Sequence, residues 1–250
     1  MKIKVSAFCN ECKKDSENDE IFGIDGIVEF NDENWYTLTC VKGHLCHTKI
    51  QAHKYELLFD QGALAIIDGY SKESVSSFSS SLERFIEYFL KIITIHHSVT
   101  FENFVKTWKL LARQSERQLG SFYFAQSCEW KEVTFLLDEK KTNFRNNVIH
   151  QGYIPSTSEA IEYGEYVLKF IIHVIKKLKE THPEAYRKGI IYQLFSSGNP
   201  MPNFIPSTTK AIPTIIGFTN SKELDKINFQ EIIGELTRNG FYKQFYIRKM

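Results

Sequence analysis

The sequence predicts a mainly α protein with a small cysteine-rich β module at its N-terminus and a mixed α/β extension at its C-terminus. Four of the five cysteines lie within residues 1–50. Apolar residues then recur at helical spacing from residue 51 to about residue 185. Four of the six prolines crowd into residues 200–213, which indicates a loop or extended arm. We therefore expect three parts: residues 1–50, 51–185 and 186–250.

The composition is that of an ordinary globular protein, with 42% hydrophobic and 24% charged residues in 250. A formal net charge of +1 provides no global attraction to nucleic acid, so any RNA affinity must come from local sites. Neither a signal peptide nor an apolar run of the roughly 18 residues needed to span a membrane is visible. These features predict a cytoplasmic protein without a membrane partner, in which thiols stay reduced.

The N-terminal cysteines have the spacing of metal ligands. Cys9 and Cys12 form a C-x2-C pair, which lets two thiolates of one tight turn reach a single tetrahedral ion. A second group of candidates occupies residues 40–47, where Gly43 relaxes the backbone as a ligand turn requires. The predicted ligands of one structural zinc ion are Cys9, Cys12, Cys40 and His44. Cys46 is the substitute for His44.

The Cys-x-x-Gly-His arrangement at residues 40–44 resembles the second knuckle of zinc-ribbon-like modules. Residues 24–39, between the two ligand groups, are rich in β-formers and are expected to form a hairpin with its turn near residues 31–34. A segment as short and polar as this one cannot bury enough apolar area to fold without a metal. The alternative is that all the cysteines are plain reduced thiols.

The pattern after residue 51 predicts a bundle of up-and-down helices joined by short loops. A first helix should end at Gly69, and a long second helix should run from Ser71 to the pair His96-His97. Two further helical segments are expected over residues 101–117 and 122–141. Cys128, in the second of these, is expected to be a buried helix residue. The capping box Ser156-x-x-Glu159 opens the last helix of the bundle, which ends at residues 181–183.

Arg145, Asn146 and His150 place a cation, a carboxamide and an imidazole on one short helical segment. Asn146 and His150 are four residues apart and share a helix face. The long side chain of Arg145 can swing toward the same spot. A guanidinium binds phosphate through two parallel hydrogen bonds, and an imidazole moves protons near neutral pH. Together the three predict a metal-free ribonuclease half-site.

This stretch resembles the R-x4-6-H motif of the HEPN superfamily, in which Asn often follows the arginine. Residues 144–170, with the motif helix, the turn at Gly152 and a long amphipathic helix, look like the same family. The resemblance covers roughly residues 51–181. It implies a HEPN-like helical bundle, to which the zinc-ribbon-like module and the mixed α/β extension are added.

The resemblance further implies a homodimeric, metal-independent endoribonuclease of a toxin or antiviral defence system, with an RNA substrate and a possible antitoxin or defence partner protein. Arg145 would hold the scissile phosphate and His150 would act as acid and base for attack by the ribose 2′-hydroxyl. Asn146 would orient His150 or a phosphate oxygen. Some toxin members carry a tyrosine two residues after the histidine that a partner enzyme nucleotidylates. Here Tyr153 is three residues on, which puts that control in doubt.

Three other interpretations stay open. Arg145 could pair with a carboxylate while His150 simply ends a helix. The bundle could be a non-catalytic adaptor that dimerises or binds a protein or nucleic acid. It could also be a nuclease that stays inactive until an assembly or ligand triggers it. The RNA target and the trigger do not follow from the sequence.

The C-terminal extension, residues 186–250, carries no predicted function. Residues 214–218 could form a strand, and residues 228–238 are expected to form a capped helix that ends at Gly240. Residues 241–248 could form a final strand.

Overall fold

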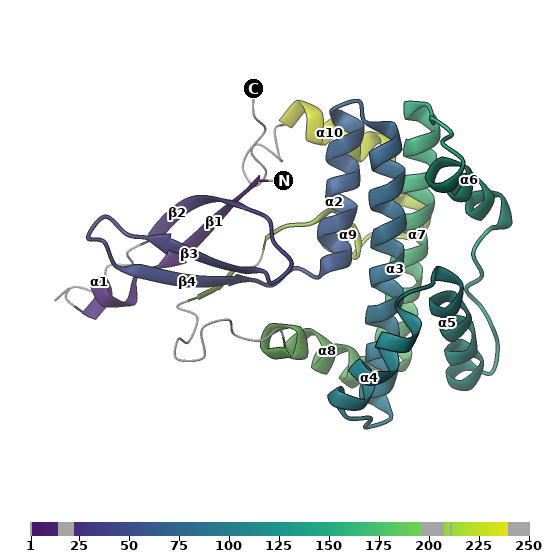
Figure 1. The fold of residues 1–250 in the computed structure, drawn as a ribbon, viewed down its shortest axis with the longest axis horizontal. Helices are drawn as coiled ribbons and strands as arrows, with labels where there is room; N and C mark the ends of the chain where they lie inside the picture. The colour runs from purple at the N-terminus through teal and green to yellow at the C-terminus, as the bar shows by residue number, and fades with distance from the viewer. Residues whose placement is uncertain (1, 15–22, 197–207, 211, 240–250) are drawn as a thin grey trace. The chain divides into compact units, whose positions relative to one another are not determined.

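The structure is a computed structural model that describes residues 2–14, 23–196, 208–210 and 212–239 (Figure 1). These residues form two compact units. The N-terminal unit comprises the described residues of Met1–His53, Tyr192–Pro213 and Gly234–Met250, and the helical unit comprises Lys54–Ile191 and Thr214–Ile233. The fold is mainly α. Among the described residues, no helix has the length and apolar character needed to cross a membrane.

The N-terminal unit contains two small sheets. The first pairs β1 (Lys2–Phe8) with β2 (Gly23–Glu29) in antiparallel register, so that Ile3 lies opposite Val28. The second pairs β3 (Trp35–Thr39) with β4 (Leu45–Ile50) antiparallel, and β5 (Thr208–Lys210) joins β4 in parallel. A short helix, α1 (Asn10–Lys14), follows β1 directly.

The prediction that residues 24–39 form one hairpin is wrong, because its two strands do not pair with each other. A turn does occur at residues 32–34, where Asn34 has a φ of 58°. However, β2 before the turn pairs with β1, and β3 after it pairs with β4. Ile3, Val5 and Ala7 of β1 are at most 1% exposed, and this strand takes β2 as its partner.

One buried cluster of the N-terminal unit consists largely of cysteines. Four buried cysteines (Cys9, Cys12, Cys40, Cys46) pack with Ala7 and Leu38. Gly26 lets the first sheet approach this cluster, because a Cβ there would lie 2.4 Å from Leu38 Cδ2. Thiols therefore contribute a large share of the buried surface in this cluster.

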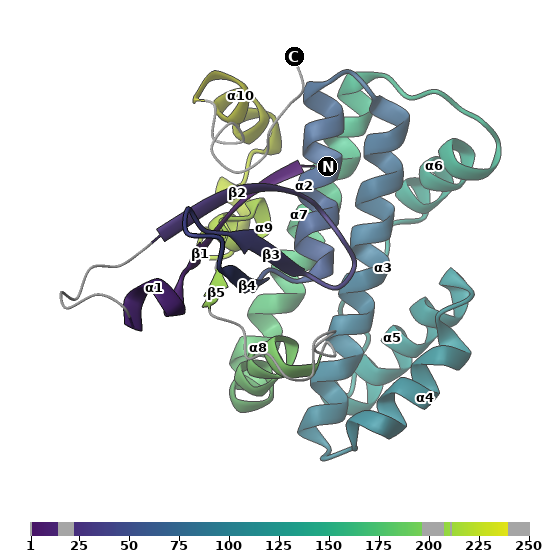
Figure 2. The ribbon, with the colours of Figure 1, turned by 60° about the vertical axis from the view of Figure 1, so that its left-hand side comes forward.

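The helical unit is built on three long helices that run side by side (Figures 1 and 2). These are α2 (Lys54–Ile67), α3 (Ser71–His96) and α7 (Thr157–Thr181). The helices α5 (Ser115–Trp130) and α6 (Glu139–His150) pack against α3, and α4 (Phe101–Leu111) contacts both α3 and α5. The remaining helices are α8 (Pro183–Ser196), α9 (Ile215–Thr219), the 3-10 turn η1 (Leu224–Lys226) and α10 (Phe229–Asn239).

Phe78 explains the close approach of α2, α3 and α7. Its ring is fully buried and contacts the rings of Phe59 in a tilted arrangement and Phe229 edge to face, with centroid separations of 4.7 and 5.7 Å. Glycines face it from both neighbouring helices: a Cβ at Gly62 or Gly164 would lie 2.5 or 2.6 Å from the ring. The bundle therefore depends on Gly62 and Gly164 for space at its centre.

The predicted ends of the first long helices are confirmed. Gly69 has a φ of 84° after α2, as a left-handed C-terminal glycine should, and α3 runs from Ser71 to His96. The capping box is also present: Ser156 Oγ accepts from the Glu159 amide, and the Glu159 carboxylate accepts from the Ser156 amide.

The helix expected over residues 122–141 is instead two helices. α5 ends at Trp130, where Lys131 adopts a left-handed φ of 62°, and Asp138 caps α6 by accepting from the Lys141 amide. Cys128 is exposed, in contrast to the expected burial, because the α5 face that packs inward carries Phe122 and Gln126.

Two expectations for the C-terminal extension are corrected. Residues 214–218, expected as a strand, form α9, because Thr214 caps the Gly217 amide and Asp60 of α2 accepts from the Ile215 amide. The helix α8 was not predicted, although Pro183 stands at its first position, where proline is favoured. α10 agrees with the predicted helix. The expected strand at residues 241–248 lies outside the described residues.

Candidate metal centre and the α6 cluster

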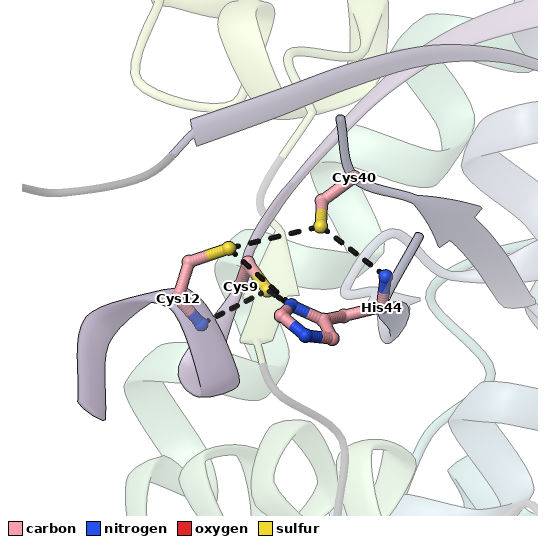
Figure 3. Close-up of side chains that lie close together, drawn as sticks. All are labelled: Cys9, Cys12, Cys40 and His44. Carbon is pink, nitrogen blue, oxygen red and sulfur yellow. Dashed lines mark hydrogen bonds between the residues drawn. The ribbon is translucent and has the colours of Figure 1, made fainter. Parts of the chain in front are cut away.

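Cys9, Cys12, Cys40 and His44, here called the Cys/His cluster, converge in the N-terminal unit (Figure 3). Cys9 follows β1 directly and Cys12 lies on α1, so the first pair spans a strand-to-helix turn. Cys40 and His44 flank the turn between β3 and β4. Gly43 has a φ of 84° and donates its amide to the Cys40 carbonyl at 2.9 Å, which closes that turn. The relaxed backbone that was predicted at Gly43 is confirmed.

The spacing of the four ligand atoms fits one tetrahedral ion. All four lie within 4.8 Å of one another. Cys12 Sγ is 3.7 Å from Cys40 Sγ and 3.4 Å from His44 Nδ1, and Cys9 Sγ is 3.6 Å from the same nitrogen. A tetrahedron with zinc–sulfur bonds of about 2.3 Å has edges of roughly 3.8 Å. This buried cluster can therefore hold a structural metal such as zinc.

Hydrogen bonds from backbone amides stabilise negative charge on two of the sulfurs. The Cys12 amide donates to Cys9 Sγ at 3.4 Å, and the His44 amide donates to Cys40 Sγ at 3.3 Å. Burial opposes ionisation of both thiols, but these and neighbouring hydrogen bonds outweigh it and lower the pKa of Cys9 and of Cys40. Burial, followed by the nearby Cys9 thiol, raises the pKa of Cys12 to about 12. A bound cation would supply the charge that a third thiolate requires.

Cys46 and His47 lie outside the Cys/His cluster. Cys46 is buried opposite Leu38 in the second sheet, and burial raises its pKa to about 12. His47 turns to the other side of β4, where its Nδ1 lies 3.0 Å from Thr37 Oγ1. The geometry thus groups His44, and not Cys46, with the three cysteines.

The second set of predicted site residues meets at the end of α6 and is called the α6 cluster. Arg145 Nη1 donates to Asn146 Oδ1 at 3.0 Å and lies 3.4 Å from His150 Nε2. On the same helix, Val148 is fully buried and His150 is exposed. The helix ends at His150 because Gly152 turns with a φ of 75° and the Tyr153 amide returns to the Asn147 carbonyl.

Sequence reasoning missed the acidic partner of Arg145. Glu83 on α3 accepts from Arg145 Nη2 at 2.9 Å, and Ser115 on α5 donates to the same Glu83 oxygen at 2.7 Å. The side chains of Arg145 and Glu83 are only 18% and 27% exposed. No local pattern could identify Glu83, because 62 residues separate it from Arg145.

A cavity of about 110 Å³ lies beside this ion pair, between α3, α5, α6 and α7. Glu83, Ser115, Arg145, Asn146 and Tyr163 form part of its wall, and His150 does not line it. Burial raises the pKa of Tyr163, whose hydroxyl lies 3.1 Å from Ser79 Oγ.

Comparison of the chain with protein-family models, with curated proteins and with solved structures finds no match.

Proposed function

We propose that this protein is a metal-independent endoribonuclease of the HEPN type that acts as a homodimer, with its N-terminal unit held together by one structural zinc ion. The observation that carries this proposal is the convergence of Arg145, Asn146 and His150 at the end of α6. A defence or toxin role, with RNA as substrate, follows from the same family resemblance.

The geometry supports a distinct task for each side chain. Arg145 Nη1 lies 3.4 Å from His150 Nε2, and an unprotonated Nε2 can accept from the guanidinium. The same unprotonated form would accept the proton of a ribose 2′-hydroxyl. The 2′-oxygen would then form a bond to phosphorus as the bond to the 5′-oxygen breaks, leaving a 2′,3′-cyclic phosphate. The departing 5′-oxygen would take its proton from His150 of the partner subunit. Arg145 would neutralise the charge that develops on the phosphoryl oxygens.

Zinc is the proposed occupant of the Cys/His cluster because three thiolates and one imidazole at tetrahedral spacing match its preferences. Four protein ligands leave no open position for a substrate or water, so the proposed role of this ion is structural.

A second candidate function is a non-catalytic adaptor, and the Arg145–Glu83 ion pair favours it. A guanidinium already bound to a carboxylate in a largely buried position resembles a structural link between α3 and α6. In the adaptor, removal of Arg145 would leave Glu83 without its cation and would destabilise the helical unit by about 1–3 kcal/mol. In the nuclease, Glu83 orients Arg145 and catalysis is lost as well.

Incubation of the full chain with single-stranded RNA in EDTA tests the nuclease directly. Arg145→Ala and His150→Ala should each abolish cleavage, and Asn146→Ala should retain an intermediate rate. Replacement of the RNA by the same sequence with 2′-deoxyribose should also prevent cleavage, because the attacking hydroxyl is absent. Products should carry a 2′,3′-cyclic phosphate.

Matched controls separate catalysis from folding. Asn147→Ala changes the exposed neighbour of Asn146, and His173→Ala removes an exposed histidine from α7. Both controls should cleave at the wild-type rate, and His150→Ala should have the wild-type melting temperature. Wild-type protein without activity, or a His150→Ala variant that cleaves normally, would leave the adaptor as the function.

A further inference from the structure

A second group of metal-binding side chains lies in the helical unit, where three helices end. His96 and His97 stand at the C-terminus of α3, Glu129 lies in the last turn of α5, and His182 follows the last residue of α7. The ligand atoms of His96, Glu129 and His182 all lie within 4.8 Å of one another. The sequence pattern placed the His96-His97 pair at the end of a predicted helix and indicated no metal role for it.

Glu129 is the centre of this group. Its side chain is 7% exposed, and its two carboxylate oxygens face different histidines. Oε2 lies 3.0 Å from His182 Nε2, and Oε1 pairs with His97 Nε2. The His96 ring completes the arrangement, with its centroid 4.4 Å from that of His182 and 5.0 Å from that of His97. A charged carboxylate is therefore held in a largely buried position among three imidazoles.

Thr181 orients the buried His182 by contacting its Nδ1, the ring nitrogen that does not face Glu129. Its Oγ1 lies 2.7 Å from His182 Nδ1 and 2.8 Å from the Lys177 carbonyl, and it accepts from Trp130 Nε1 at 3.2 Å. The hydroxyl has one proton. When it donates to the Lys177 carbonyl, His182 Nδ1 must carry its own proton. A neutral His182 then presents its Nε2 lone pair toward Glu129, and a cation can bind both groups there. In a protonated His182, Nε2 would instead donate to the carboxylate.

We propose that His96, Glu129 and His182 bind a divalent transition-metal cation of the zinc class, independently of the Cys/His cluster. Two imidazoles and one carboxylate form a donor set that zinc and its neighbours in the first transition row favour. With ligand bonds of about 2.0–2.2 Å, neighbouring ligand atoms lie roughly 3.0–3.6 Å apart, and the His182–Glu129 distance already meets this spacing. His97 and Thr181 hold the ligands in place, as partners of metal ligands commonly do.

The site is open on one side, because His96 is exposed while Glu129 and His182 are largely buried. The ion therefore exchanges with solution and ties together the ends of α3, α5 and α7. It is also remote from the α6 cluster. Glu83, the partner of Arg145, precedes His96 by 13 residues of α3, which corresponds to roughly 20 Å of helix rise. Metal binding here is thus compatible with RNA cleavage that needs no metal.

Equilibrium dialysis of the full chain against Zn²⁺, followed by elemental analysis, tests this proposal. Wild-type protein should hold two equivalents. His96→Ala and Glu129→Gln should each hold one equivalent, because they lose the ion of the helical unit. Cys9→Ser should also hold one equivalent, because it loses the ion of the Cys/His cluster. His97→Ala should keep the second ion with an affinity roughly 10- to 100-fold lower, because it removes a supporting hydrogen bond. His173→Ala, which removes an exposed histidine of the same unit, should hold two.

Cobalt distinguishes the two sites in the same protein. One equivalent in wild type should produce strong thiolate-to-cobalt absorption, and the second should add only weak absorption typical of nitrogen and oxygen ligands. His96 is the preferred test position because its exposed ring can be removed without opening the core, as circular dichroism would verify. Equal zinc content in wild type, His96→Ala and Glu129→Gln would overturn the proposal. The proposal would also be overturned if His173→Ala lost as much zinc as His96→Ala.

Discussion

Arg145 illustrates how one side chain can serve two neighbours. One terminal nitrogen of its guanidinium binds Glu83, and the other faces Asn146 and His150. The Glu83 contact fixes the guanidinium and balances part of its charge. The exposed His150 makes no such buried ion pair. Arg145→Ala should therefore lower both stability and cleavage, whereas His150→Ala should lower cleavage alone.

Cys9 and Cys46 provide a matched pair for the metal centre. Both thiols are 2% exposed in the same small core, but only Cys9 belongs to the Cys/His cluster. Cys9→Ser should therefore lose the zinc of the N-terminal unit, while Cys46→Ser should retain it. Zinc content measured after dialysis against a weak chelator decides this. The assignment of His44 as the fourth ligand fails if Cys46→Ser loses zinc and His44→Ala keeps it.

At the scale of elements, specific local turns and caps set the ends of the helices. Gly69 and Gly152 supply left-handed turns after α2 and α6. Each turn depends on a few residues, so sequence patterns locate it well. Asp138, which caps α6, lies inside the single helix that the sequence predicted over residues 122–141. The division between α5 and α6 is different. Gln126 binds both the amide and the carbonyl of Phe135, which holds an extended segment that no local pattern predicts.

The capping box of α7 yields a prediction on stability and pH. Hydrogen bonds from the Ser156 amide and hydroxyl, and from Tyr153, lower the pKa of Glu159 below 4.5. A carboxyl whose folded pKa is depressed contributes stability above its unfolded pKa and loses it as pH falls through the folded value. Ser156→Ala should cost about 1 kcal/mol at neutral pH, and less as the pH falls through the lowered pKa of Glu159.

Urea unfolding at several pH values measures this effect, with Ser158→Ala as the control. Ser158 lies exposed two residues further along α7 and has no part in the capping box. It should change stability little at any pH. Equal losses in the two variants, or a Ser156→Ala loss that stays constant down to pH 3, would count against the proposed linkage.

At the scale of the whole molecule, the described residues separate into an N-terminal unit and a helical unit. The first contains a buried cluster made largely of thiols, and the second has an aromatic and aliphatic core. Their stabilities should accordingly depend on different things: bound metal for the N-terminal unit and hydrophobic burial for the helical unit.

Dimerisation is the prediction that belongs to this scale. One arginine and one histidine are few groups for phosphodiester cleavage, and a two-fold axis near His150 would double them. Ile154, four residues after His150, is 79% exposed and would be covered by such an interface. Ile154→Glu should therefore convert the dimer to a monomer and lower the rate of cleavage. Leu110→Glu, at a position 69% exposed on α4, should do neither.

Light scattering coupled to gel filtration measures the mass of each variant. A wild-type protein that is monomeric at micromolar concentration, or an Ile154→Glu variant that remains a dimer with full activity, would rule out this arrangement.

Local chemistry in the sequence was sufficient to predict the ligand set of the metal centre, the ends of the long helices and the three residues of the α6 cluster. Each depends on contacts within one turn or on a short spacing, such as the C-x2-C pair or the i, i+4 relation of Asn146 and His150. Only the tertiary structure decided that β2 pairs with β1, that Glu83 binds Arg145, and that Glu129 meets His96 and His182. These contacts join residues far apart in the chain, and they are selected by how whole helices and strands pack to bury their apolar faces, which no local pattern records.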